Sequence, residues 1–179
     1  MIKQSDSDLF AFLFIAPEPI LVFTNKFDVR LMTTSGGDYR LVSHTLSSSS
    51  AAIDIKDEMI YWTDIRNKTI SRVHKDSNLK TQHKVEIVLH HLDKPEALAI
   101  DWISRKLYWL DTGKNTISVS NLDGSHTKTL ITGTDAVELR TLAVYPEKGF
   151  VLFKKITFLK EPWYLNLMYI IQAFPTCVD

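Results

Sequence analysis

The sequence of 179 residues predicts an all-β fold, part of a β-propeller made of four-stranded antiparallel blades. The first observation is the stretch from Ala97 to Ile131, in which four short strand-like runs alternate with turns. The second is its recurrence, because the Tyr-Trp pair at Tyr61 returns 47 residues later (108 − 61) at Tyr108. A third copy places Leu152 at the tyrosine position after 44 residues (152 − 108). Repeats of this length with four strands each are typical of propeller blades.

The chain begins with an apolar leader, for which we take residues 1–19. The run from Leu9 to Ala16 has the length of a signal-peptide core, but Asp6 and Asp8 precede it where such a peptide prefers positive charge. A degenerate signal peptide and a simple apolar leader therefore both remain open. The run is too short to cross a bilayer.

The remaining strands are expected wherever aliphatic and aromatic runs lie between turn residues. They form an incomplete first blade, a second blade and the start of a fourth, at 20–24, 28–33, 40–42, 51–54, 59–64, 69–73 and 142–153. In the third blade, Asp123 and Gly124 predict a hairpin turn, because glycine accepts positive φ without strain.

Apolar residues occupy consecutive strand positions, as in Ile60, Tyr61 and Trp62. Successive strand residues point to opposite faces of a sheet, so both faces of each blade are expected to be covered by neighbours. The aspartates that follow, Asp64 and Asp111, would cost several kcal/mol if buried alone. We therefore expect each to accept hydrogen bonds from backbone or side-chain donors, with the neighbouring blade as one source.

The composition excludes several classes of protein. Lys plus Arg (21) equals Asp plus Glu (21), which gives no general attraction for nucleic acid. The single cysteine, Cys177, excludes an internal disulfide framework. No motif indicates a cofactor or a small-molecule substrate.

The segment Tyr61-Trp62-Thr63-Asp64 resembles the YWTD signature of the low-density lipoprotein receptor class B repeat, and 108–111 resembles a one-residue variant. The resemblance covers about residues 16–153, which we take as a partial six-bladed propeller of about three blades over 20–153. The residues that carry this signature and its flank are Tyr61, Trp62, Thr63, Asp64, Asp101, Tyr108, Trp109 and Asp111.

Residues 16–31 resemble the opening of the first propeller in the Wnt co-receptors among the low-density lipoprotein receptor-related proteins. This resemblance implies an extracellular segment of a membrane-anchored receptor that binds secreted Wnt ligands or Wnt antagonists. An endocytic receptor of lipoproteins and other proteins is the alternative within the family.

The sequence departs from the family pattern after Phe153, where Lys154 and Lys155 follow instead of Thr-Asp. We therefore take residues 154–179 as a tail outside the family and expect a truncated product of a longer receptor. Its apolar part, from Trp163 to Phe174, could form a helix or a strand packed over an exposed blade face. Half a propeller leaves blade faces uncovered, so we expect the isolated chain to be weakly stable, prone to aggregate or dependent on a partner.

In the co-receptors the binding face lies at the loops between strands and is acidic with aromatic residues. The resemblance places this face at Asn25, Lys26, Ser48, Ser49, Arg66, Lys68, Glu96 and Arg140. Ser48 and Ser49 replace the usual acidic pair, so the face is only partly preserved. A glycosylation sequon begins at Asn67.

An enzyme is the alternative of another class, because some six-bladed propellers are metal-dependent hydrolases. The repeat itself explains Asp54 and Asp101, and neither a nucleophile motif nor a partner base accompanies them. We therefore expect no enzyme and no metal site.

Overall fold

The computed structural model describes residues 18–76, 84–134, 137–157 and 165–172. The predicted leader thus lies outside the described residues except at 18 and 19. The strands are β1 (Ile20–Thr24), β2 (Asp28–Thr33), β3 (Arg40–His44), β4 (Ala51–Asp54), β5 (Met59–Asp64), β6 (Thr69–His74), β7 (Glu86–Leu89), β8 (Pro95–Asp101), β9 (Lys106–Asp111), β10 (Thr116–Asn121), β11 (Lys128–Thr132), β12 (Val137–Tyr145), β13 (Phe150–Thr157) and β14 (Leu165–Gln172). A short 3₁₀ helix, η1 (Pro146–Lys148), joins β12 to β13.

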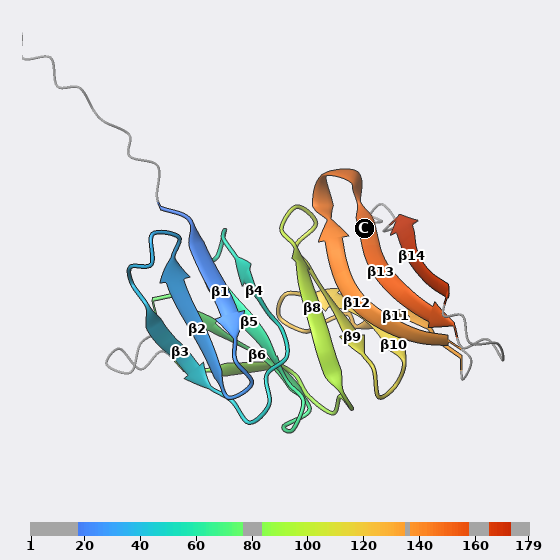
Figure 1. The fold of residues 1–179 in the computed structure, drawn as a ribbon, viewed down its shortest axis with the longest axis horizontal. Helices are drawn as coiled ribbons and strands as arrows, with labels where there is room; N and C mark the ends of the chain where they lie inside the picture. Colours follow the sequence, from blue (N-terminus) through green and yellow to red (C-terminus); the bar gives the residue numbers. More distant parts are fainter. Residues whose placement is uncertain (1–17, 77–83, 135–136, 158–164, 173–179) are drawn as a thin grey trace, which may run out of the picture.

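These strands form four antiparallel sheets that follow one another in chain order (Figure 1). The sheets are β1-β2-β3, β4-β5-β6-β7, β8-β9-β10-β11 and β12-β13-β14. The first strands of successive sheets are neighbours, because β4 contacts β8 and β8 contacts β12. This arrangement confirms the predicted all-β fold and its four-stranded blades, with two full blades between two three-stranded ones.

The strand boundaries differ from the predicted ones mainly in the outer half of each blade. The fourth strand of the second blade, β7, was not located by the repeat comparison. The fourth blade begins earlier than predicted, at Val137, and its first strand carries a bulge between Arg140 and Leu142. The first two strands have the predicted bounds.

The aromatic pair of each repeat divides between two inter-sheet cores. Trp62 packs in a cluster with the first sheet, and Tyr61 packs in a cluster with the third sheet. The third sheet repeats this division, because Trp109 faces back to the second sheet and Tyr108 faces the fourth. All four side chains are at most 5% exposed. Both faces of the two full blades are therefore covered, as the consecutive apolar residues predict.

The sheet of the fourth blade continues beyond Phe153. β13 extends to Thr157, and β14 pairs with it from Phe150 opposite Gln172 to Thr157 opposite Leu165. The described part of the apolar tail is thus an edge strand of this sheet and does not lie over a blade face as a helix. The proposed family boundary at 153 stays a prediction, because strand pairing does not test family membership.

The outer face of the first sheet is partly uncovered. Val29 and Leu31 face the second sheet, whereas Leu21 and Tyr39 are 51% and 57% exposed. Arg30 lies over the ring of Tyr39 and donates to its hydroxyl at 3.0 Å. The weak stability expected of the isolated chain remains a prediction. Within the described residues, no helix has the length and apolar character needed to cross a membrane.

Candidate functional site

The predicted binding residues come together at one end of the sheets, which we call the loop end. It comprises the β1–β2, β5–β6 and β9–β10 turns and the connections that lead from β3, β7 and β11 to the next sheet. Strand antiparallelism places these segments at the same end. Backbone hydrogen bonds join them, from Leu92 N to Lys68 O at 3.2 Å and from Thr112 N to Lys94 O at 2.9 Å.

The signature aspartate of the second blade organises its part of the loop end. The carboxylate of Asp64 is buried and accepts hydrogen bonds from the backbone N–H groups of Arg66 and Asn67, both at 3.0 Å. It also accepts from the Asn67 side-chain amide at 3.0 Å and from Leu46 N at 3.0 Å. Because Leu46 belongs to the connection from the first sheet, Asp64 fixes its own turn and the incoming chain together.

Asp111 does the same in the third blade. Its Oδ1 accepts from Gly113 N and Lys114 N at 3.1 Å in the β9–β10 turn. The incoming connection contributes Asp93 N at 2.8 Å and Lys94 N at 2.9 Å. Both signature aspartates therefore have the donors that their burial requires, and they act as supports of the loop end.

The other recurring aspartates lie at the opposite end of the sheets. Asp54 is fully buried and forms a bidentate ion pair with Arg105 of the third blade, at 2.6 and 2.7 Å. Asp101 accepts hydrogen bonds from Ile103 N and Ser104 N at 2.9 Å and has no ion pair within the described residues. Sequence reasoning missed Arg105, although it follows the counterpart of Asp54 in the next repeat by four residues (105 − 101).

The predicted residues of the first two sheets play different parts. Asn25 Oδ1 accepts from Asp28 N at 3.0 Å and closes the β1–β2 turn, while Lys26 O accepts from Ser48 N at 2.7 Å. Ser49 is exposed, but Ser48 is only 6% exposed, so its hydroxyl does not belong to the surface. Ser48 is the more buried of the two serines because the connection from β3 to β4 turns inward at the hydrogen bond between Ser48 N and Lys26 O.

The β5–β6 turn presents three exposed residues, Arg66, Asn67 and Lys68. Lys68 Nζ forms an ion pair with Asp93 Oδ1 at 3.0 Å, across the gap between the second and third sheets. The hydrogen bond from Lys68, together with the positive charges of Lys68, Lys94 and Lys114, holds the pKa of the Asp93 carboxyl below its usual range. The side-chain amide of Asn67 is the nitrogen that a glycan would modify, and it donates to Asp64.

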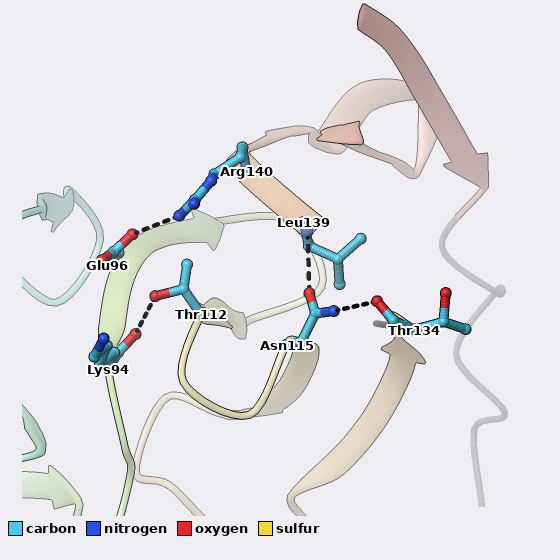
Figure 2. A pocket seen from close by; sticks show the side chains of 7 residues that line it. All are labelled: Lys94, Glu96, Thr112, Asn115, Thr134, Leu139 and Arg140. Carbon is cyan, nitrogen blue, oxygen red and sulfur yellow. Dashed lines mark hydrogen bonds and ion pairs between the residues drawn. The ribbon is translucent and has the colours of Figure 1, made fainter. Parts of the chain in front are cut away.

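A polar depression of about 410 Å³ lies between the third and fourth sheets (Figure 2). Glu96 and Arg140 form an ion pair across it at 3.5 Å, so the structure brings these two predicted residues together. Asn115 accepts from Leu139 N at 3.0 Å and donates to Thr134 O at 3.3 Å, which fixes the floor. The lining residues are Lys94, Glu96, Thr112, Asn115, Thr134, Leu139 and Arg140.

Five of these lining residues were not predicted from the sequence. The repeat period could have indicated the depression, because Glu96 and Arg140 are separated by 44 residues (140 − 96), one repeat. Residues one repeat apart occupy the same place in adjacent sheets.

One group of metal-ligand types occurs among the described residues, away from the loop end. Glu58, His74 and Asp76 place one ligand atom each within 4.8 Å of one another. His74 Nδ1 accepts from Asp76 N at 3.3 Å, its Nε2 lies 3.5 Å from Glu58, and Lys75 pairs with Glu58 at 2.5 Å. These contacts describe a cluster of ion pairs and hydrogen bonds among the chain's own side chains.

Comparison with known proteins gives these sheets a family. Residues 105–146, which include the second aromatic signature at 108–111 and the strands from β9 to β12, match the model of the low-density lipoprotein receptor repeat class B. This chain contains a low-density lipoprotein receptor class B repeat. This confirms the resemblance seen at the two aromatic signatures.

Curated relatives agree with this assignment. The chain is 36% identical over 141 residues to mouse low-density lipoprotein receptor-related protein 5, covering 76% of this chain and 8% of that protein. It is 33% identical over 117 residues to chicken low-density lipoprotein receptor-related protein 8, covering 65% of this chain and 13% of that protein. The chain thus spans a small part of the relatives it matches.

Solved structures show the same fold at lower identity. A chain in a nidogen/laminin complex superposes with a TM-score of 0.64 at 21% identity, over 75% of this chain and 52% of that one. A TolB-like protein of Agrobacterium tumefaciens gives 0.60 at 17% identity, over 76% and 50%. These class B repeat sheets therefore correspond to about half of each matched chain.

Proposed function

We propose that this chain contributes a protein-binding surface to the extracellular part of a low-density lipoprotein receptor-related protein of the Wnt co-receptor kind. Secreted Wnt ligands or Wnt antagonists would be its partners. The observation that carries the proposal is the 36% identity to receptor-related protein 5 over 141 residues, which covers 76% of this chain. The loop end is the proposed binding face, because it gathers exposed polar side chains from successive sheets around the polar depression.

Binding is favoured over catalysis by the state of the recurring aspartates. Asp54 and Asp101 are the carboxylates that a metal-dependent hydrolase would need near the axis. The Asp54 carboxylate is paired with the Arg105 guanidinium. The Asp101 carboxylate is buried and accepts hydrogen bonds from two backbone N–H groups. A buried carboxylate with these partners serves the fold. The named relatives are also receptor-related proteins.

An endocytic receptor is the second candidate. It is supported by the 33% identity to chicken receptor-related protein 8 over 117 residues. The two candidates share the class B fold and differ in the ligand that the loop end accepts. Only a binding experiment separates them.

The experiment immobilises the full chain and titrates it with peptides from secreted Wnt antagonists and with protein ligands of endocytic receptors. The co-receptor proposal expects saturable binding of an antagonist peptide that weakens when Glu96 and Arg140 are both replaced by alanine. Alanines at Glu147 and Lys148, which are exposed in η1 away from the loop end, leave the net charge equally unchanged and serve as the control. Binding of the endocytic ligands alone would reject the co-receptor role in favour of the second candidate.

An extracellular location is proposed with this function, and the sequon at Asn67 provides its test. Asn67 is exposed in a turn, where a transferase can reach it in a secretory host. Lectin binding should be present in the secreted chain and lost on Asn67→Gln. An unglycosylated chain from such a host would count against this location.

A further inference from the structure

Within the described residues, the first sheet lacks the strand that begins each of the other three. In those sheets β4, β8 and β12 lie beside one another, and each pairs with the strand that follows it. β1 takes the place of β5, because residues 24–25 at its end correspond to Thr63 and Asp64. Asn25 also closes its turn as Asp64 does, by accepting from the backbone N–H three residues further on. β1 therefore pairs with β2 alone among the described strands, and its other edge is free.

The hydrogen bonds of β1 show which backbone groups point to this free edge. Thr34 N donates to Pro19 O at 2.9 Å, and Asn25 N donates to Asp28 O at 3.1 Å, so the odd-numbered residues bond toward β2. Alternate residues of an antiparallel strand bond to opposite sides, and the even-numbered residues therefore direct their N–H and C=O groups to the free edge. These residues are Ile20, Val22 and Thr24.

The second sheet shows how the corresponding edge is filled. Thr63, the counterpart of Thr24, donates its N–H to Ser50 O at 3.0 Å, beside the start of β4. With β4 at this edge, β5 is buried at every position after its first. Every position of β1 is half-buried or exposed. β1 thus has the exposure of an edge strand, although its sequence place is that of an inner strand.

Apolar side chains of β4 are also left partly open beside this edge. Ala51 and Ile53 are half-buried and pack at the margin of the core between the first two sheets. Their counterparts 47 residues later (98 − 51), Leu98 and Ile100, are 5% and 7% exposed and pack in a cluster with Ala52 of β4. A strand added beside β1 would cover Ala51 and Ile53 as β4 covers Leu98 and Ile100.

β1 carries none of the usual protection of an exposed sheet edge. Its sequence, Ile-Leu-Val-Phe-Thr, has no charge, and its pairing with β2 has no bulge. The outer strands β3, β7 and β11 each contain a charged residue, and each pairs with its neighbour across a register shift. An uncharged and uninterrupted edge is a template for pairing with a further strand.

The residues before β1 cannot reach this edge through the turn that the other sheets use. In those sheets the residue before the second strand is left-handed, with φ of 55° at Glu58, 57° at Arg105 and 65° at Gly149. Pro19 holds this place before β1, and its ring restricts φ to about −65°. A strand from another polypeptide is free of this restriction.

We propose that the free edge of β1 binds an extended segment of another protein as an added antiparallel strand of small and aliphatic residues. The segment hydrogen-bonds to the even-numbered residues of β1 and covers Ala51 and Ile53. β4 and β8 indicate its chemistry, because Ala-Ala-Ile and Ala-Leu-Ala-Ile occupy this place in the next two sheets. The edge uses none of the loop-end residues, so its test is independent of the proposed function.

The test uses the full chain and a fluorescent peptide that copies Ala97–Ile100 between solubilising ends. Ser50 accepts from β5, so its counterpart Ala97 and the alternate residue Ala99 are the positions that face β1. N-methyl groups on both alanines should weaken binding by at least about tenfold, because they remove hydrogen bonds to β1. The matched peptide with N-methyl groups on its leucine and isoleucine should stay within about threefold of the parent peptide, because these amides point away from β1.

Thr24→Pro tests the same contact from the protein. It removes an N–H at the free edge and none that bonds to β2, so it should weaken binding of the parent peptide by at least about tenfold while the chain still unfolds cooperatively. Hydrogen exchange of the wild type with the peptide should be slowed at the amides of Val22 and Thr24. The two N-methylated peptides use the wild-type chain and decide the proposal even where Thr24→Pro does not fold.

Equal binding of the two N-methylated peptides would overturn the proposal, because no backbone edge would then be read. Amide protection confined to β7, β11 or β14 would assign the peptide to a different edge. A wild-type dimer in light scattering that the peptide does not dissociate would show that a second copy fills the edge, and it would equally overturn the proposed partner.

Discussion

Arg105 of the third blade holds the fully buried carboxylate of Asp54 in the second blade through its two terminal guanidinium nitrogens, Nη1 and Nη2, at 2.6 and 2.7 Å. The pair crosses an inter-sheet boundary at the end of the propeller away from the loop end. Arg105 also contacts Asp57, and hydrogen bonding to Asp54 raises the pKa of its guanidinium. This ion pair therefore joins the second and third blades in addition to the aromatic core between them.

Arg105→Met should destabilise the chain strongly. Removing one partner leaves the Asp54 carboxylate buried and uncompensated, which costs about 3 kcal/mol in unfolding free energy. Urea denaturation of the full chain measures the loss. Arg66→Met, at an exposed arginine, should change the unfolding free energy by less than about 0.5 kcal/mol. Equal effects of the two variants would mean that the inter-blade pair contributes nothing.

Gly149→Arg should create the same pair one blade further along. Gly149 occupies the repeat position of Arg105, and the two residues share a left-handed backbone, with φ of 65° and 57°. An arginine there would face Asp101, which has no ion pair within the described residues. A double-mutant cycle with Asp101→Asn should give a favourable coupling of about 1–2 kcal/mol. A coupling of zero would show that the fourth blade does not repeat the geometry of the third.

Gly124→Ala should cost more than Gly36→Ala. Both glycines have positive φ, 86° and 88°, so alanine pays a similar backbone penalty of about 1 kcal/mol at each. At Gly36 the added Cβ meets open space, whereas at Gly124 it would lie 2.2 Å from Val88 O of the second blade. The excess at Gly124 should be about 1–3 kcal/mol in thermal or urea unfolding. Similar costs would mean that the β10–β11 turn does not press on β7.

Tyr61→Phe should remove a buried hydrogen bond. It should also reduce the loss of folding stability at alkaline pH. The hydroxyl donates to Leu122 O at 3.1 Å, and Arg72 donates to the same carbonyl, so we expect a loss of about 1 kcal/mol at neutral pH. Burial raises the pKa of Tyr61, so the folded state favours the neutral phenol. The stability it contributes is complete below about pH 10 and is lost as pH rises through the raised folded pKa.

The comparison of wild type and Tyr61→Phe in urea at neutral pH and above pH 10 checks this. The variant should lose less stability on alkalinisation than the wild type. Tyr108, whose pKa is also raised by burial, keeps its share in both proteins. If both proteins lost the same stability at alkaline pH, groups other than Tyr61 would be responsible for that loss.

The inner strands could be predicted from the sequence because each carries apolar residues on both faces. Tyr61 and Trp62 specify a strand with two neighbours, and the structure supplies both. The outer strand β7 and the edge strand β14 lack this signature, because a strand at the outside of a blade needs no aromatic pair. The long connection that precedes β7 also made the position of this strand difficult to predict from the repeat pattern.

The site was predicted less well than the fold, because its residues lie on turns. Burial of Ser48 follows from one backbone bond to Lys26, and such a bond leaves no trace in the sequence. The Glu96–Arg140 pair depends on two sheets meeting at a fixed angle. By contrast, the roles of Asp64 and Asp111 could be predicted, since a carboxylate after a buried strand must find donors.

Hydrogen–deuterium exchange of the full chain with a bound Wnt-antagonist peptide locates the binding face. We expect slowed exchange in the amides of 92–96 and 112–115 around the polar depression, with no change in the β4–β5 and β8–β9 turns. Protection confined to 55–58 and 102–105, at the opposite end of the sheets, would contradict it.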